Sequence, residues 1–358
     1  MKDIFETLYD FDDFLIEPAI LSSIRSRSVI NTRNIWGELP LMTAPMDTVV
    51  SENNFHLYKN NGILPVLPRI ANPTDDWVDT NIFLSYSLQD FERIFLLHRK
   101  RVDSGSRFMV LIDVANGHMS DLYDLVKEAK LIYGYDMCLM VGNVANPETY
   151  KLFSDAGADY VRIGIGNGGG CLTTVQTGVG YPMASLVHEC YQISCELASP
   201  AKIVADGGFK SYADIIKALA LGADHVMLGS ILNKALESAG DTYLANTKGE
   251  GWTEPGERIN QYSNETRNLF NYGTKMFKKF RGMSTKEAQK SMGKTELKTS
   301  EGVSRMQPVE YTLVGWRDNF VSYLSSAMSY SNASSLKEFI GNAKWNIISQ
   351  NSLNRFKK

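Results

Sequence analysis

Short apolar runs alternate with amphipathic stretches along this chain, and that alternation limits the possible folds more than any other feature of the sequence. Runs such as FMVLIDV (108–114) and MCLMVGNV (137–144) are continuously apolar, as strands buried on both faces are. The stretch between them, MSDLYDLVKEAKLIYG (119–134), has apolar residues three and four positions apart, which indicates a helix. Strand followed by helix, repeated in this way, predicts an α/β protein with a parallel sheet covered by helices.

The unusual residues of the sequence lie where a predicted strand ends and a helix begins. They are Asp47, Asp113, Asn116, Asn143, a glycine-rich loop over 164–170, Asp206-Gly207-Gly208 and Gly229-Ser230. In a (β/α)8 barrel these loops share one face, which is the face that holds active sites. A doubly wound open sheet is the competing architecture, but no GxGxxG motif near the start supports a dinucleotide-binding domain of that kind. We therefore predict a single (β/α)8 TIM barrel over residues 1–358.

Two segments fall outside the barrel pattern. Residues 1–38 are predicted to form an irregular N-terminal arm. After residue 233 the alternation stops, and a long polar stretch follows that exceeds an ordinary connector. We predict a long mobile flap at about 247–302 that covers the mouth of the barrel. Within the barrel, TDDWVDTNIFLSY (74–86) is predicted to be helical from the spacing of its apolar residues.

Composition excludes several classes of protein. The formal net charge is −3, which leaves no basic footprint for nucleic acid. No apolar run approaches the roughly 18 residues of a membrane span. The four cysteines form neither a CxxC pair nor a zinc-binding pattern with histidine. The prediction is a soluble protein of a reducing compartment, most simply the cytoplasm, with a small-molecule partner rather than nucleic acid or membrane.

Cys171 follows five glycines within seven residues, Gly164 to Gly170. Such a loop turns sharply and brings its backbone close to a ligand, so the thiol is presented at a mouth rather than in a core. A thiolate stabilised by loop N–H groups is a good nucleophile, and the hydroxyls of Thr173 and Thr174 favour catalysis over an inert thiol on a flexible loop. Glu301, in the predicted flap, is a candidate proton carrier, although charged loop residues are commonly only solvated.

The glycine turns after the next two predicted strands indicate an anion site. Backbone N–H groups of Gly207, Gly208, Gly229 and Ser230 would bind a phosphate, and Asp206 would accept hydrogen bonds from ribose hydroxyls. An ordinary turn is the alternative for the DGG triplet taken alone.

Eight motifs carry a family resemblance. In chain order these are APMDTV, DVANGH, GNVANPE, GADYVRIGIG with the following TT pair, TGVGYP, ADGG, GADHVMLGS and RGMS. They resemble the IMP dehydrogenase/GMP reductase family over nearly the whole chain. The resemblance implies one (β/α)8 barrel assembled as a homotetramer, and no CBS-type insert is recognisable. DVANG, TGVGYP and ELKTSEG are similar to the GMP reductase branch, and the Arg-Tyr pair that activates water in IMP dehydrogenases is not recognisable between 291 and 302.

What this resemblance implies is NADPH-dependent reductive deamination of GMP to IMP and ammonia, through a bond between Cys171 and purine C2. Catalytic roles carry over to Cys171, Thr173 and Glu301. The implied substrate contacts are Gly169, Asp206, Gly207, Gly208, Gly229, Ser230, Met283, Ser284, Lys298, Ser300 and Gly302. The implied cofactor contacts are Asp113, Asn116, Asn143 and Thr174. Backbone carbonyls of Gly166, Gly168 and Cys171 would hold a monovalent cation, K⁺.

Several positions depart from the family pattern. Gly169 stands where the family has a serine, Leu67-Pro68-Arg69 where it has a His-Lys pair, and Lys298 where reductases have arginine. The stretch 247–275 is also longer than in typical reductases. Because each change touches the nucleotide or cofactor end, the exact purine nucleotide and the choice of NADPH over NADH stay open. The alternatives to a reductase are IMP dehydrogenase, action on a different purine nucleotide, and a non-catalytic nucleotide-binding barrel.

Overall fold

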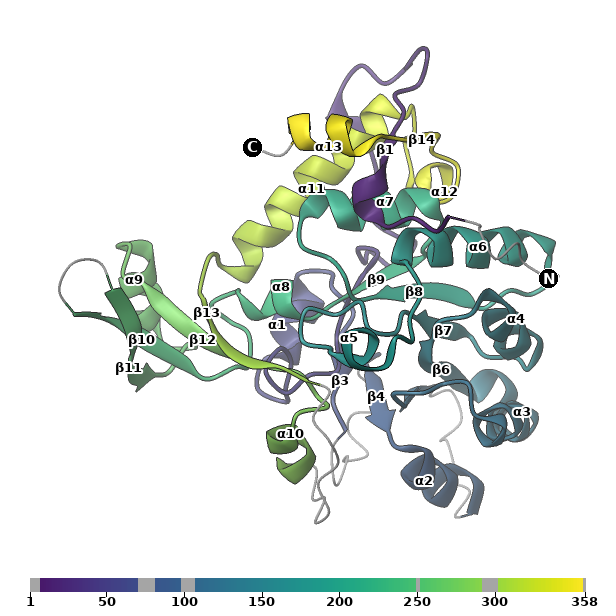
Figure 1. Ribbon diagram of the computed structural model, residues 1–358, viewed down its shortest axis with the longest axis horizontal. Helices are drawn as coiled ribbons and strands as arrows, with labels where there is room; N and C mark the ends of the chain where they lie inside the picture. Colours follow the sequence, from purple (N-terminus) through teal and green to yellow (C-terminus); the bar gives the residue numbers. More distant parts are fainter. Residues whose placement is uncertain (1–6, 70–80, 98–106, 249–251, 292–301, 357–358) are drawn as a thin grey trace.

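A parallel sheet closed into a barrel forms the centre of the molecule (Figure 1). The computed structural model describes residues 7–69, 81–97, 107–248, 252–291 and 302–356. In sheet order the strands are β2 (Leu41–Thr43), β9 (His225–Leu228), β8 (Lys202–Asp206), β7 (Tyr160–Ile163), β6 (Met137–Val144), β5 (Phe108–Asp113), β4 (Phe83–Tyr86) and β3 (Val66–Leu67). A parallel bridge between Met42 and Leu64 closes the sheet on itself. The predicted (β/α)8 TIM barrel is confirmed.

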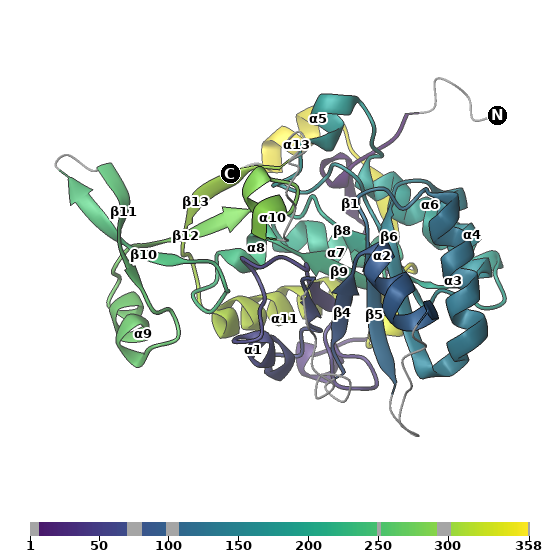
Figure 2. The same cartoon turned by 90° about the horizontal axis from the view of Figure 1, so that it is seen from below.

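Both faces of the barrel strands are buried, which explains their continuously apolar sequences. In β6, Cys138 and Met140 belong to the small cluster that fills the barrel, whereas Leu139 and Val141 belong to the larger cluster outside it. That larger cluster lies between the sheet and the helices that surround it (Figures 1 and 2). The alternation of a strand is therefore present but is invisible in a hydropathy pattern.

Helices connect the strands and cover the outside of the barrel. They are α1 (Phe55–Asn60), α2 (Leu88–Phe91), α3 (Ser120–Tyr133), α4 (Pro147–Asp155), α5 (Thr173–Thr177), α6 (Met183–Glu196), α7 (Tyr212–Leu221), α8 (Ser230–Asn233) and α11 (Leu313–Tyr330), with α12 (Leu336–Phe339) and α13 (Gln350–Phe356) at the end of the chain. Local sequence fixes several boundaries. A capping box of Ser211 and Asp214 begins α7, and Gly222, in a left-handed conformation, ends it.

The third barrel strand corrects the sequence-based prediction. Residues 83–86, predicted as the end of a helix, form β4. Phe83 packs inside the barrel and Leu84 outside it, so neighbouring apolar residues serve opposite faces of one strand. A short apolar run of this kind fits both templates, and its length favours a strand. The rest of the predicted helix, 74–80, lies outside the described residues.

The part of residues 1–38 that the structure describes is largely irregular. It contains two single-turn 3-10 helices, Phe11–Asp13 and Arg27–Val29, and a short strand, β1 (Phe14–Ile16). This strand pairs antiparallel with β14 (Trp345–Ile347), so the two ends of the chain are joined beside the barrel.

A second, antiparallel sheet occupies most of the predicted flap region. Its order is β11 (Trp252–Ile259), β10 (Thr242–Lys248), β12 (Met276–Arg281) and β13 (Ser304–Pro308), with α9 (Asn264–Asn271) and α10 (Lys286–Ser291) in the connections. The β10–β11 hairpin and α9 project away from the barrel, whereas β12 and β13 run back to its mouth (Figures 1 and 2). The polar composition of this region suggested a cover over the mouth. In the β10–β11 hairpin, the polar residues instead belong to a two-stranded ribbon that is exposed to solvent.

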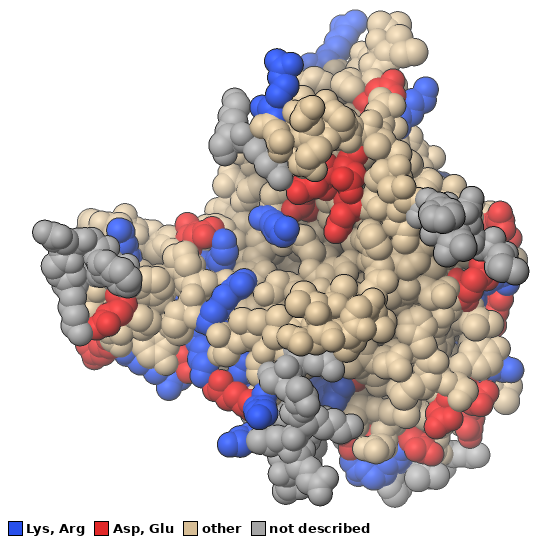
Figure 3. Space-filling model, viewed as in Figure 1, with Lys and Arg blue, Asp and Glu red and all other residues tan. Residues whose placement is uncertain are grey.

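The surface carries no strong preponderance of either charge on the face shown in Figure 3, where acidic and basic side chains surround a largely uncharged centre. The whole sequence has 37 Lys and Arg against 40 Asp and Glu. Among the helices that the structure describes, none combines the length and apolar character needed to cross a lipid bilayer.

Candidate active site

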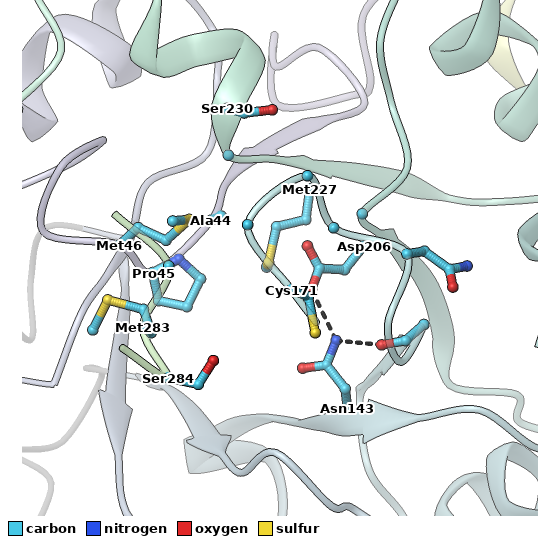
Figure 4. A pocket seen from close by; sticks show the side chains of 18 of the residues that line it. Ala44, Pro45, Met46, Asn143, Cys171, Asp206, Met227, Ser230, Met283 and Ser284 are labelled. Carbon is cyan, nitrogen blue, oxygen red and sulfur yellow. Dashed lines mark hydrogen bonds between the residues drawn. The ribbon is translucent and has the colours of Figure 1, made fainter. Parts of the chain in front are cut away.

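A cavity of about 480 Å³ opens at the carboxyl ends of the barrel strands. Its walls come from the loops after β2, β3, β5, β7, β8 and β9, from Asn143 within β6 and from the end of β12. Figure 4 shows Cys171, Asp206, Asn143, Ser230, Met283 and Ser284 projecting toward this space from different elements. The size suits a small organic ligand, and the position is the usual one for active sites in this fold.

Cys171 lines the cavity and is half-buried. Its amide donates to the Gly168 carbonyl at 2.9 Å, which closes the tight turn that presents the thiol. The thiol donates to the Thr173 hydroxyl at 3.3 Å. The other cysteines have different surroundings: Cys138 and Cys190 are buried, and Cys195 is exposed. Burial raises the pKa of Cys138 to about 12, so its thiol stays protonated and unreactive.

The turn before Cys171 requires glycine for steric reasons. Gly166 has a φ of +83°, and a Cβ on it would lie 1.6 Å from the Thr174 hydroxyl oxygen. A Cβ on Gly170 would lie 2.8 Å from the Phe280 ring. The high glycine density therefore reflects close approach of neighbouring chain segments, as well as the sharp turn that the sequence suggested.

The residues next to β12 and β13, within or beside the predicted flap, are hydrogen-bonded to the cysteine loop and to one another. The Val303 amide donates to the Gly170 carbonyl at 3.0 Å, and Cys171 forms an antiparallel bridge with Gly302. Gly282 donates to the Val303 carbonyl at 2.9 Å. Of the predicted flap contacts, Met283 and Ser284 line the cavity and Gly302 is paired with Cys171. Lys298, Ser300 and Glu301 lie outside the described residues.

Unused backbone donors gather at the opposite end of the cavity. The N–H groups of Gly207, Gly208, Gly229 and Ser230 donate to no acceptor within the ranges that the structure describes. All four residues line the cavity, as does Gly169. Gly207 and Gly208 have φ values of +96° and +88°, a conformation that L side chains rarely adopt. Clustered free amides of this kind are suited to binding an anion, which is the role that the sequence suggested for them.

Two carboxylates in the wall are held by one buried arginine. Arg162 donates to Asp113 at 2.8 Å and to Asp206 at 2.9 Å. Burial alone would lower the pKa of Arg162, but Asp206 and Asp113 raise it above its ordinary value, so this guanidinium stays charged. Asn143 donates to the same oxygen of Asp206, Oδ2, at 2.8 Å. Asp206 Oδ1, by contrast, accepts from none of the described residues.

Arg69 also reaches this wall, because it contacts both the backbone carbonyl and the carboxylate of Asp113. It follows directly after the Leu67-Pro68 pair that departs from the family pattern, and it lines the cavity.

The structure places some of the four predicted cofactor contacts in the cavity wall and the others outside it. Asp113 and Asn143 line the cavity. Asn116 is exposed beside it, and its side-chain carbonyl accepts from the His118 amide in a local turn. Thr174 turns its hydroxyl to the Val179 carbonyl at 2.7 Å and faces a second cavity behind the loop. The structure therefore brings two of these four residues to the site.

Sequence reasoning missed Arg162, Phe280 and Arg305. Arg162 is a charged residue inside the apolar strand run Tyr160–Ile163, which is a signal that its side chain faces partners within the barrel. Phe280 and Arg305 face one another on β12 and β13, and only the pairing of those strands places Arg305 against Phe280, which lines the cavity.

The fold and the site together define a (β/α)8 barrel with a thiol on one strand-end loop and free backbone donors on the two that follow. The family model described as IMP dehydrogenase / GMP reductase domain matches residues 84–251. A GMP reductase of Phytophthora infestans is 31% identical over 93% of this chain and 88% of its own length. A GMP reductase of Vibrio campbellii is 29% identical over 92% and 91%, and one of Clostridium acetobutylicum is 29% identical over 77% and 85%. The chain belongs to the IMP dehydrogenase/GMP reductase family.

Proposed function

We propose that this chain is a GMP reductase, which converts GMP, NADPH and protons to IMP, NADP⁺ and ammonia. The observation that carries the proposal is the position of the Cys171 thiol, in the cavity and 3.3 Å from the Thr173 hydroxyl, with free backbone donors at the other end. A purine nucleotide bound by its phosphate at those donors would extend its base toward the sulfur. The names of the relatives support the same activity.

Nucleotide binding would use groups that the fold leaves available. The N–H groups of Gly207, Gly208, Gly229 and Ser230 would hold the phosphate without the desolvation of a charged side chain. Arg162 and Asn143 orient Asp206 through its Oδ2, so Oδ1 is left to accept from the ribose hydroxyls. Met283 and Ser284 would contact the base from the mouth of the cavity.

The first chemical step forms a covalent adduct. The Cys171 thiolate attacks C2 of GMP, the bond from C2 to the exocyclic nitrogen breaks, and the protonated amine leaves as ammonia. Thr173, next to the sulfur, would deliver the proton in a relay with Glu301. Covalent capture divides one difficult displacement into two easier steps.

When bound, NADPH would supply the hydride that takes the place of sulfur at C2, and Cys171 would be released as the thiolate together with IMP. The residues of this chain that would hold the cofactor beside Cys171 are Asp113 and Asn143. A monovalent cation, K⁺, would bind the carbonyls of Gly166, Gly168 and Cys171. These carbonyls fit that role because they come from one tight turn and because Gly168, which already accepts from Cys171, retains a second lone pair.

The assembly implied by the resemblance is part of the same proposal. We expect a homotetramer in the cytoplasm, which agrees with the unpaired state of all four cysteines.

Two reactions test the proposed function. The protein is mixed with GMP and NADPH, and separately with IMP and NAD, while absorbance of the reduced nicotinamide is followed. We expect consumption in the first mixture only. Reduced cofactor formed only in the second mixture would instead identify an IMP dehydrogenase.

Two single-cysteine variants provide a matched comparison. Cys171→Ala is expected to abolish turnover while it leaves GMP affinity within about threefold, because the thiol acts in chemistry rather than in binding. Cys195→Ala, which removes an exposed thiol outside the cavity, should keep full activity. Normal turnover by the Cys171 variant would exclude the covalent route.

A further inference from the structure

The Arg305 guanidinium lies beside Gly169 and Phe280, two residues of the cavity wall. Arg305 is on β13, directly opposite Phe280 on β12. Its guanidinium carbon stands 5.1 Å from the centroid of the Phe280 ring, and that ring forms part of the cavity wall. A cation held against an aromatic face is restricted in orientation before any ligand arrives.

Gly169 shows how close this cation is to the proposed phosphate position. A Cβ built on Gly169 would lie 3.5 Å from the Ser230 hydroxyl oxygen and 3.6 Å from Arg305 Nη2. Both donors therefore surround one small space beside the glycine turn. Because a donor hydrogen-bonded to a phosphate oxygen lies about 4 Å from phosphorus, a single phosphate in that space can contact Ser230 and Arg305 together.

Among the residues that the structure describes, no carboxylate neutralises the charge of Arg305. The other arginines near the cavity have acidic partners: Arg162 pairs with Asp113 and Asp206, and Arg281 pairs with Asp47. Arg305 pairs with no acidic side chain in the part of the chain that the structure describes, and it is exposed. Gly169, for its part, contributes no side chain. A positive charge without a partner, beside free amides and an open space, is suited to an anion.

We propose that Arg305 binds the 5′-phosphate of the nucleotide and makes the site selective for phosphorylated over unphosphorylated purines. The inference rests on the proposed function, because it takes the nucleotide to bind in this cavity. The guanidinium supplies the charged side-chain contact that Gly169 cannot supply, and its contact with Phe280 keeps it in place.

The expected effect is a loss of affinity confined to the phosphate. Arg305→Gln should weaken GMP binding about tenfold or more, since it removes a hydrogen bond between two charged groups. Guanosine binding should be unchanged. Arg305→Lys should retain part of the GMP affinity as a point charge. In turnover, KM for GMP should rise while kcat stays near wild type, whereas a merely structural role at the base of the flap would lower kcat.

Equilibrium titration calorimetry of the full chain with GMP, guanosine and inorganic phosphate tests the inference without turnover. Arg258→Gln is the matched control, because Arg258 is an exposed arginine of the same four-stranded sheet that pairs with Asp241, and neither residue lines the cavity. GMP affinity that is unchanged in Arg305→Gln, or that falls equally for GMP and guanosine, would overturn the inference and leave the proposed function standing. Failure of the wild-type protein to bind GMP would overturn both.

A second substitution locates the effect. Gly169→Ser is sterically acceptable, because its Cβ would meet only ordinary contacts at 3.5 and 3.6 Å and Gly169 lacks a positive φ. Its hydroxyl would enter the space that Arg305 and Ser230 share. In the Arg305→Gln background it is expected to restore part of the lost affinity for GMP and none for guanosine.

Discussion

Arg162 is the residue whose replacement tests the wall of the site most directly. Its side chain is 10% exposed and lies between Asp113 at 18% and Asp206 at 15%, with contacts of 2.8 and 2.9 Å. Arg162→Met keeps the aliphatic part of the side chain and removes the guanidinium with its charge. Asp206 is then left without a cation, and Asp113 retains only Arg69.

The magnitude follows from this burial. Removing one partner of a buried ion pair costs about 3–5 kcal/mol of stability. Because both carboxylates keep some exposure to solvent, we expect the loss in the free energy of unfolding to lie near the lower end of this range, at about 3 kcal/mol. With an unfolding entropy of about 2.1 cal/mol/K per residue, this loss lowers Tm by about 4 °C in a chain of 358 residues. Nucleotide affinity should fall as well, because Asp206 retains only Asn143 to orient it.

Differential scanning fluorimetry of the wild type and two variants provides the assay. Arg258→Met is the control, since Arg258 is 69% exposed in its pair with Asp241 and such surface pairs contribute less than about 1 kcal/mol. We expect a Tm decrease of about 4 °C for Arg162→Met against about 1 °C or less for the control. Equal decreases in the two variants would refute the reasoning that the buried cation holds this wall together.

Two further predictions concern the flap base and the barrel interior. A Cβ on Gly282 would lie 2.5 Å from the Gly170 carbonyl oxygen. Gly282→Ala should therefore displace this segment from the cysteine loop and lower kcat about 100-fold. Gly315→Ala in α11 is the control, and full activity of the Gly282 variant would contradict the prediction. Burial and the charge of Lys202 lower the pKa of His225 to about 3. Between pH 6.5 and 3 the unfolded chain therefore takes up a proton that the folded chain does not, so stability falls as pH falls, by up to about 1.4 kcal/mol per pH unit. His225→Leu should flatten the decrease of Tm from pH 7 to pH 5, and an unchanged decrease would show that His225 does not cause it.

The sequence predicts the barrel well because its strands are buried on both faces and follow one another with helices between. The same pattern assigns Cys171, Asp206 and Ser230 to one face, since parallel strands end at the same edge of a barrel. The structure brings these three side chains to one cavity.

Residues 83–86 show where local pattern fails. Inside and outside the barrel are equally apolar, so Phe83 and Leu84 leave no period of two in the sequence, although they face opposite sides. The spacing of the neighbouring apolar residues then matches a helix by chance. Only the pairing of this segment with β3 and β5 settles its conformation.

Polar residues at strand ends are ambiguous for a different reason. Asn116 and Thr174 hydrogen-bond to backbone groups within nine residues, and neither lines the cavity. Asn143 on β6 and Arg162 on β7 hydrogen-bond to Asp206 at the end of β8, 63 and 44 residues away in sequence. The chemical type of a polar residue does not show whether its side chain will hydrogen-bond to nearby backbone or to a residue distant in sequence. These assignments therefore depend on tertiary structure.

The pairing of Gly302 with Cys171 makes two distant parts of the chain a single mechanical unit. The loop of Cys171, the proposed nucleophile, and the segments beside β12 and β13 share hydrogen bonds through Gly170 and Val303, so neither can move far without the other. A displacement of these segments from the mouth would also disturb the turn that positions the Cys171 thiol. The proposed nucleophile would therefore be correctly positioned only while its surroundings are assembled, which would limit its exposure to oxidants and electrophiles between turnovers.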